Sequence, residues 1–196
     1  VRMTSSRILM NKAAEEDWDL FADDASQAFL NAPRPADKPV FALYPAGFEK
    51  PGHCLQIMKM LYGLHDAPLG WQQLVAHHLV VEQGFRQSAS DACVFIKRVG
   101  QEQVYVAVHV DDFLSTGTPK LLADYRKKLH ARFKMTGGEC HTYYGLSVRR
   151  DRERRLLFLG CEKYIKQKLK DFDIANAVPA STPMASDVPL PKMDGE

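Results

Sequence analysis

The stretch Val104-Tyr105-Val106-Ala107-Val108-His109-Val110-Asp111-Asp112 decides the fold of this chain. Valines recur at every second position in it, and alternate side chains of a β-strand point to opposite faces of a sheet. The pattern predicts a strand whose valines face the core, with Tyr105, Ala107, His109 and Asp111 on the opposite face. The two aspartates come where the strand has to turn, so we expect both carboxylates near one hairpin tip.

The Asp111-Asp112 pair has two interpretations. Aspartate favours turns, so a solvated turn explains the pair on its own. A second acidic segment, Phe21-Ala22-Asp23-Asp24, favours a metal site, because three carboxylates on neighbouring strand ends can hold two divalent ions. Oxygen-only ligands select a hard ion such as Mg²⁺. The third carboxylate is Asp23 or Asp24, and spacing alone does not choose between them.

Periodicity along the rest of the chain predicts an α+β protein, in which an antiparallel sheet is covered on one face by helices. The clearest helix is 68–83, where Trp71, Val75 and Leu79 fall on one apolar stripe and Gly84 ends the pattern. The other expected helical segments are 4–16, 25–31, 118–133 and 162–172. The expected strands are 18–23, 40–44, 54–58, 93–98, 104–110 and 113–115, followed by a hairpin of 142–149 with 155–159. From residue 177 onward, prolines and few large apolar groups predict an extended tail.

The composition places the chain among globular proteins. It has 196 residues, of which 45% are hydrophobic, enough to bury a core. Its longest apolar run is far too short to cross a bilayer, and no segment resembles a signal peptide, so we expect an intracellular protein without a membrane partner, cytoplasmic or nuclear. The four cysteines lie far apart, which predicts reduced thiols rather than disulfides. A zinc site from the pairs His53-Cys54 and Cys140-His141 is the weaker alternative, because the spacing within each pair is poor.

Charge is distributed unevenly along the chain. The segment 120–170 carries fifteen Lys or Arg against five Asp or Glu, whereas the remaining residues are acidic on balance. This division favours a cation-holding surface in one part and a polyanion-binding surface in the other. A solvated helix face explains part of the basic excess by itself.

Several short motifs follow one another in a recognisable order. They are Asp24-Ala25-Ser26-Gln27-Ala28-Phe29-Leu30-Asn31, Tyr44-Pro45-Ala46-Gly47-Phe48-Glu49, Leu61-Tyr62-Gly63-Leu64-His65-Asp66-Ala67-Pro68 with Trp71, Ser88 with Asp91, Cys93, Val94 and Phe95, His109-Val110-Asp111-Asp112, Tyr144-Gly145-Leu146, Arg150-Asp151-Arg152, Tyr164-Ile165 and Thr182-Pro183. In this order they resemble the reverse transcriptase of copia-type LTR retrotransposons over almost the whole chain. In that family the first motif begins with a catalytic aspartate, and the resemblance therefore selects Asp24.

The resemblance implies a fold and a domain organisation. It implies a polymerase palm with partial fingers elements over 1–135, a hairpin and basic helix at the palm/thumb junction over 136–176, and an extended proline-rich tail over 177–196. Most of the fingers are missing from the sequence, as are the RNase H and integrase regions of the polyprotein, which we expect as partners. The implied reaction is addition of deoxynucleotides to a primer, directed by an RNA or DNA template.

The resemblance also implies roles for individual residues. Asp24, Asp111 and Asp112 would be the catalytic residues and the ligands of two Mg²⁺ ions, for which Mn²⁺ is a possible substitute. The nucleotide-binding residues would be Phe29, Tyr62, Gly63, His109 and Val110, with Phe29 excluding a 2′-hydroxyl; as an isolated residue, Phe29 would read as ordinary core. The residues following the phosphates of a primer–template would be Arg149, Arg150, Arg152, Lys163, Lys166 and Lys170.

The chain departs from the family pattern at several positions. His109 stands where the family usually has Tyr, and Asp66 stands where it usually has Gln, which adds negative charge near a triphosphate. Two functions therefore compete: a piece of an active polymerase, and an inactive retroelement remnant that serves as a structural or binding module in a host assembly. A metal-dependent nuclease is the third class, and the sequence offers no further base or ligands for it.

Overall fold

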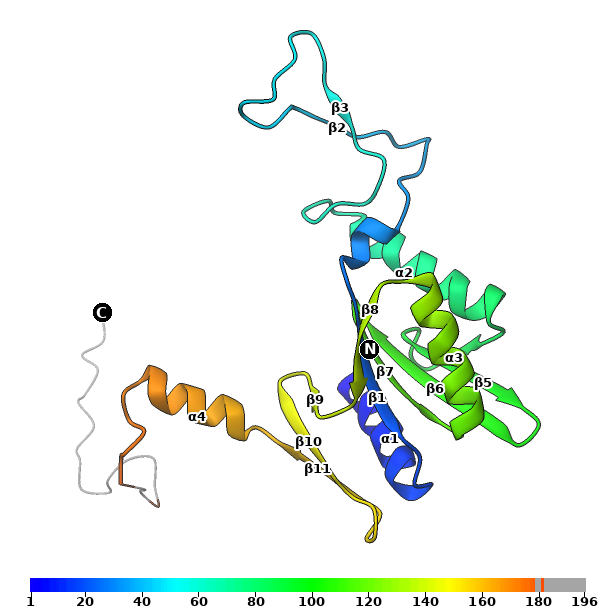
Figure 1. Ribbon diagram of the computed structural model, residues 1–196, viewed down its shortest axis with the longest axis vertical. Coiled ribbons are helices and arrows are strands. Elements are labelled where there is room, and N and C mark those ends of the chain that lie inside the picture. The colour runs from blue at the N-terminus through cyan, green and yellow to red at the C-terminus, as the bar shows by residue number, and fades with distance from the viewer. Residues whose placement is uncertain (179–180, 182–196) are drawn as a thin grey trace, which may run out of the picture. The chain divides into compact units, whose positions relative to one another are not determined.

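The computed structural model describes residues 1–178 and 181, and the chain divides into two units, Val1–Gly160 and Cys161–Glu196. The first unit is built on a six-stranded antiparallel sheet in the order β4-β5-β6-β7-β1-β8 (Figure 1). Its strands are β4 (Arg86–Gln87), β5 (Val94–Val99), β6 (Glu102–His109), β7 (Asp112–Gly117), β1 (Leu20–Ala25) and β8 (Met135–Glu139). The expected α+β class with antiparallel strands is confirmed.

One face of the sheet carries the larger core. The valines of β6 are buried there against α2 (Ala67–His77) and α3 (Pro119–Arg132), as their alternation predicts. Trp71 and Val75 of α2 meet Leu122 and Leu129 of α3 in this core, and each is at most 2% exposed. Burying a large apolar side chain stabilises a fold by about 1.5–3 kcal/mol, so this layer fixes both helices to the sheet.

The prediction that helices cover only one face is wrong. Helix α1 (Met3–Glu15) packs on the second face, where Leu9, Met10 and Ala13 form a core with Ala107 and Leu114. Figure 1 shows α1 beside β1, on a different side of the sheet from α2 and α3. The physical reason is that both faces of β6 and β7 carry apolar side chains, Val106 and Phe113 on one and Ala107 and Leu114 on the other, so both faces need cover.

The structure contains a central strand pairing that the sequence did not predict. β8 pairs with β1 over Phe21 to Ala25, so β1 lies between β7 and β8 rather than at an edge. The sequence of β8, Met-Thr-Gly-Gly-Glu, has almost no apolar alternation. Gly137 allows this pairing, because its φ of +132° and the absence of a side chain let β8 pass close to Asp23.

A second sheet of the first unit has the strand order β11-β10-β9. Its strands are β9 (Thr142–Tyr143), β10 (Leu146–Asp151) and β11 (Leu156–Gly160). The expected single strand 142–149 is wrong, because Tyr144 and Gly145 have positive φ values of 51° and 74° and turn the chain between β9 and β10. The hairpin of β10 with β11 is present.

The remaining elements of the first unit are short. The predicted helix 68–83 is α2 continued by a π-helical turn, η2 (His78–Glu82), and the predicted turn 25–31 shortens to the 3₁₀ helix η1 (Ala28–Asn31). The strands expected over 40–44 and 54–58 shrink to the pair β2 (Phe41–Ala42) and β3 (Leu55–Gln56).

The described part of the second unit contains helix α4 (Glu162–Asp171), close to its predicted range. The predicted tail, 177–196, lies outside the described residues except for 177, 178 and 181. Among the described residues, no helix has the length and apolar character that crossing a membrane requires.

Candidate functional site

The turn between β6 and β7 is a two-residue hairpin connection, Val110-Asp111. His109 and Asp112 are the cross-strand pair that closes it. Val110 has a φ of +55°, a conformation that a β-branched residue adopts only under strain. Its carbonyl accepts a hydrogen bond of 2.6 Å from the indole Nε1 of buried Trp71. Helix α2 thus holds the strained turn in place, and such strain is typical of functional sites.

The register of β1 brings a third aspartate to this turn. Asp24 lies directly opposite Asp112 in the β1–β7 ladder, and the Ala25 amide donates a 2.8 Å hydrogen bond to the Asp111 carbonyl. The residues predicted as catalytic, Asp24, Asp111 and Asp112, therefore meet at one end of two neighbouring strands.

The structure separates Asp24 from its neighbour Asp23. The Asp23 side chain is completely buried and points to α3, where Arg126 donates two hydrogen bonds to it, of 2.9 and 2.7 Å. Asp24 is exposed on the other face. Of the two candidates that the sequence left open, Asp24 is the one at the site.

Burial and neighbouring charges raise the pKa of two carboxylates of the site, Asp24 and Asp112. Partial burial, followed by the charge of Asp111, raises the pKa of Asp24. Burial also raises the pKa of Asp112, reinforced by the charges of Asp111 and Asp24 and opposed by His109. The charges of neighbouring carboxylates therefore act on Asp24 and Asp112, and a cation between the carboxylates would relieve this repulsion.

The residues present fit a hard divalent cation by their chemistry. All three side chains offer carboxylate oxygens, the ligands that Mg²⁺ prefers. Among the described residues, no three His, Cys, Asp or Glu side chains are arranged as a finished metal site. The backbone register therefore brings the three carboxylate-bearing residues to one end of two neighbouring strands.

Aromatic side chains from the second sheet flank this cluster. The His109 ring lies 5.0 Å from the ring of Tyr144, edge to face, and Tyr143 packs against Tyr144 at 4.4 Å. A cavity of about 250 Å³ opens here, lined by Asp112, Tyr143 and Tyr144 among others. Burial, followed by the neighbouring Tyr143, strongly raises the pKa of Tyr144. Tyr144 had no predicted role, and only its place in a motif pointed to it.

The predicted nucleotide-binding residues fall into two groups. His109 and Val110 belong to the acidic hairpin. Phe29 and Tyr62 form a separate aromatic pair with ring centroids 4.7 Å apart, followed by Gly63 at a φ of +93°. Tyr62 is 61% exposed, whereas Phe29 also packs against the core.

Asp66 does not leave an uncompensated charge beside this pair. The nearly buried Arg34 binds it at 3.0 Å, and this contact lowers the pKa of Asp66 despite partial burial. The sequence did not reveal Arg34 as a partner.

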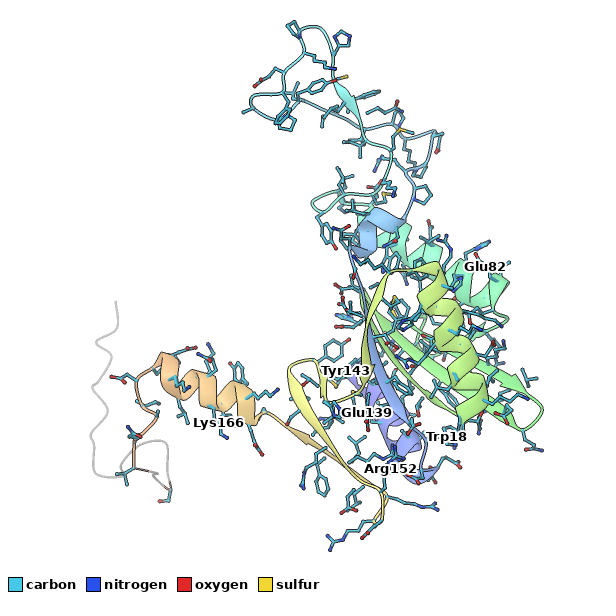
Figure 2. The ribbon with its side chains drawn as sticks, in the orientation of Figure 1. Trp18, Glu82, Glu139, Tyr143, Arg152 and Lys166 are labelled. Carbon is cyan, nitrogen blue, oxygen red and sulfur yellow. The ribbon has the colours of Figure 1, made fainter. Side chains whose placement is uncertain are left out.

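The predicted nucleic-acid-binding residues lie in different environments. Arg149 is exposed with its guanidinium over the Phe158 ring at 4.5 Å. Arg150 instead donates to the carbonyls of Trp18 and Ala13, and Arg152 pairs with Asp17 at 3.0 Å. Figure 2 labels Trp18 and Arg152 in this region. These contacts hold the β10–β11 hairpin to the α1–β1 connection, so they give Arg150 and Arg152 a structural role. Lys163, Lys166 and Lys170 are exposed on α4 of the second unit.

The candidate zinc ligands are not brought together. Cys54, Cys93, Cys140 and Cys161 are all free, as predicted, and no metal-holding group is found among the described residues.

The fold and the site define a class, an α+β domain that gathers carboxylates at one end of an antiparallel sheet, as metal-assisted phosphoryl transfer requires. The family model described as reverse transcriptase (RNA-dependent DNA polymerase) matches residues 1–186, and the chain belongs to this family. The resemblance to copia-type reverse transcriptases found in the motifs is confirmed.

Three relatives illustrate the match. The chain is 33% identical over 198 residues to the retrovirus-related Pol polyprotein from transposon TNT 1-94 of Nicotiana tabacum, covering 98% of this chain and 15% of the relative. It is 33% identical over 197 residues to the Pol polyprotein from transposon RE1 of Arabidopsis thaliana, covering 98% and 13%. It is 30% identical over 190 residues to that from transposon RE2 of Arabidopsis thaliana, covering 95% and 13%. The chain thus spans less than a sixth of these polyproteins. No solved structure matches it.

Proposed function

We propose that this chain is the polymerase part of a retrotransposon Pol polyprotein and that it adds deoxynucleotides to a primer by two-metal phosphoryl transfer. The observation that carries the proposal is the strand register that sets Asp24 opposite Asp112 beside the Asp111 turn. Residues 1–135 form the palm with partial fingers elements in this proposal, and 136–176 form the junction with the thumb.

The three aspartates have the central role. Asp24 and Asp111 would hold two Mg²⁺ ions, with Asp112 as support; when bound, the ions stabilise the charge that develops on the triphosphate and favour ionisation of the primer hydroxyl. Burial raises the pKa values of Asp24 and Asp112 first, and the charges of neighbouring carboxylates raise them further; bound cations would remove this second contribution. Trp71 keeps the turn in its strained conformation, so the carboxylates are positioned before the substrate arrives.

The aromatic residues position the substrates. Phe29 lies under the sugar of the incoming deoxynucleotide and excludes a 2′-hydroxyl, with the ring of Tyr62 packed against it at a tilt and Gly63 leaving the backbone accessible. His109 and Val110 lie at the primer terminus. The pairing of Asp66 with Arg34 supports this assignment, because it reduces the repulsion of a triphosphate.

The exposed basic residues bind the primer–template through its phosphates. Arg149, Lys163, Lys166 and Lys170 act in this way without reading sequence. Arg150 and Arg152 contribute by holding the hairpin that carries Arg149.

Primer extension tests the proposal. The chain, and the chain joined to the preceding region of a related polyprotein, would be supplied with primer–template, deoxynucleotides and Mg²⁺. We expect Asp111→Asn to lower extension by about 100-fold or more, since it removes a charge that the ions need. The matched control is Asp37→Asn, which removes the charge of an exposed aspartate that is not one of the three site aspartates.

The outcomes separate the competing functions. Extension by the Asp111→Asn variant at the unmodified rate would refute the assignment of the site. Extension by neither form of the unmodified chain, with primer–template binding retained, would favour the binding module over the polymerase.

A further inference from the structure

A buried ion pair lies directly behind the catalytic strand. The Asp23 side chain is 0% exposed and the Arg126 side chain is 21% exposed. Arg126 Nε donates to the Asp23 Oδ2 atom and Arg126 Nη2 donates to Asp23 Oδ1, and His130 Nε2 lies 3.2 Å from Oδ1. The same guanidinium stacks on the Phe21 ring, with its carbon 3.9 Å from the ring centroid. This pair is not part of the proposed site, because it faces α3.

The sequence of β1 makes its register vulnerable. A slip of one residue turns every side chain of a strand to the other face. Because Asp23 and Asp24 are adjacent, a slip in one direction would still put an aspartate, Asp23, opposite Asp112, with Ala22 then facing Arg126. A slip in the other direction would put Asp24 against Arg126 and Ala25 opposite Asp112. Only the observed register places an acid at both positions.

We propose that the Asp23–Arg126 ion pair locks the register of β1 and thereby selects Asp24, rather than Asp23, as the carboxylate of the polymerase site. Asp23 is thus a positioning residue, and the inference rests on the proposed function for the role of Asp24. Removing one partner of a buried ion pair leaves an uncompensated charge, so an alternative register that relieves this charge gains population. Fixing a register is the best-attested use of such buried polar groups.

The neighbouring contacts also favour the observed register, but they do not outweigh an unpaired buried charge. Phe21 and Ala25 pack on the α3 side and Leu20 packs on the α1 side, but Ala22 fits either environment by size. Gly137 of β8 fixes how close β8 and β1 approach, and it has no side chain to tell Asp23 from Asp24.

The decisive variant is Asp23→Ala. This variant leaves Arg126 without its carboxylate. The register slip that puts Asp24 against Arg126 restores an ion pair, but it moves Asp24 away from Asp112. We expect Mn²⁺ binding, followed through the electron paramagnetic resonance signal of free Mn²⁺, to weaken at least tenfold although residue 23 does not face the site. Adding Arg126→Leu removes the unpaired cation, and the double variant should bind Mn²⁺ within about twofold of the unmodified chain. Asp124→Ala is the matched control, because it removes an acid of α3 that pairs only with a partly exposed lysine.

A second measurement reads the register without any metal. Cross-strand nuclear Overhauser effects between β1 and β7 report Ala22 opposite Leu114 in the observed register. We expect Asp23→Ala to show a second set of cross-strand contacts, and the double variant to return to the first set. If Asp23→Ala does not fold, Arg126→Lys keeps the charge but loses the two-pronged contact, and it should show both sets.

The results discriminate between the two proposals. A folded Asp23→Ala (or, failing it, Arg126→Lys) chain with native contacts and unchanged Mn²⁺ affinity would overturn the register lock, and a lower melting temperature alone would show a merely structural ion pair. If Asp111→Asn binds Mn²⁺ as well as the unmodified chain does, the metal site fails instead. The cross-strand contacts then still decide the register.

Discussion

Asp91 shows how one side chain joins segments that are far apart in the sequence. Helix α1 begins at Met3 without a side-chain cap of its own. Asp91 takes this role from the loop before β5, accepting hydrogen bonds from the Arg2 amide at 2.9 Å and the Ser5 hydroxyl at 2.6 Å. Partial burial opposes its charge, but these donors and the Cys93 amide lower the pKa of Asp91 to about 2.

The cap predicts a pH-dependent loss of stability. We expect Asp91→Ala to lower the free energy of unfolding by about 1–2 kcal/mol at neutral pH, the usual loss for a helix cap. The folded pKa of about 2 lies below the ordinary 3.8, so the contribution is complete above the ordinary value and is lost as the pH falls through the folded one. Urea unfolding of both chains between pH about 7 and about 2 measures this. A difference between the chains that stays constant down to the lowest pH would contradict the cap.

The residue scale also marks the limit of sequence reasoning at the site. Asp111 and Asp112 are predictable from their position at the end of an alternating strand. Without the family resemblance, spacing does not distinguish Asp24 from Asp23; in the structure, what distinguishes Asp23 is a partner, Arg126, that lies 103 residues away in the sequence. Contacts of this kind depend on the tertiary arrangement and leave no local pattern.

At the scale of elements, the pairing of β8 with β1 depends on one glycine. A Cβ at Gly137 would lie 2.2 Å from the Ala22 carbonyl oxygen and 2.7 Å from Asp23 Cα, both backbone atoms that cannot move aside. At the neighbouring Gly138, a Cβ would meet nothing within 4 Å.

The two glycines therefore predict opposite results. Gly137→Ala should destabilise the chain by about 2–3 kcal/mol, because it overpacks a strand interface. Gly138→Ala should change the free energy of unfolding by less than about 0.5 kcal/mol. Chemical denaturation of the two variants side by side checks this, and equal losses would mean that β8 does not approach β1 as described.

Arg150 clamps the β10–β11 hairpin to the end of α1, and this contact gives a second prediction. The Arg150 side chain, 13% exposed, donates to the Ala13 carbonyl at 2.6 Å and to Asp17 at 3.1 Å. Arg150→Ala should cost about 2–3 kcal/mol in the free energy of unfolding, since it removes the guanidinium donors from the part-buried carbonyls of Ala13 and Trp18. Arg154→Ala is the control, because that side chain is 76% exposed and lies 3.9 Å from its nearest acid. If the two variants lose equal stability, Arg150 does not clamp the hairpin.

Helices and strands were predicted correctly where the apolar periodicity is strong. They were missed where backbone pairing with a distant strand, rather than an apolar pattern, determines the structure. The helices over 68–83 and 118–133 and the strand over 104–110 follow from their patterns. The sequence did not predict β8, because two of its five residues are glycines and two are polar, and this composition is not typical of a strand. The sequence did not predict that α1 covers the second face of the sheet. Tyr105 and Ala107 were placed on the face opposite the core valines, and in the structure they pack on the α1 side.

At the scale of the whole molecule, the basic segment 120–170 does not act as one surface. Arg126 neutralises a buried aspartate, and Arg150 and Arg152 bind the chain's own backbone and acids. The charges that remain for a polyanion are the exposed ones, including Arg149 and Lys166.

This division predicts how binding to a primer–template depends on salt. The logarithm of the affinity should fall linearly with the logarithm of salt concentration, and Arg149→Ala or Lys166→Ala should each reduce the slope by about one. Arg7→Ala, an exposed change on α1, should leave the slope unaltered. Fluorescence anisotropy of a labelled duplex gives these slopes. A flat response in the unmodified chain would favour a module without a nucleic-acid partner.

The bond from Trp71 to the carbonyl of Val110 has a practical consequence. The chain has two tryptophans, and one of them has its indole nitrogen hydrogen-bonded to the turn between β6 and β7. With Trp18 replaced by phenylalanine, ultraviolet emission from the remaining indole becomes an intrinsic optical sensor of that turn. Binding of a nucleotide, a cation or an inhibitor at the proposed site beside this turn would then be titrated without attaching a dye.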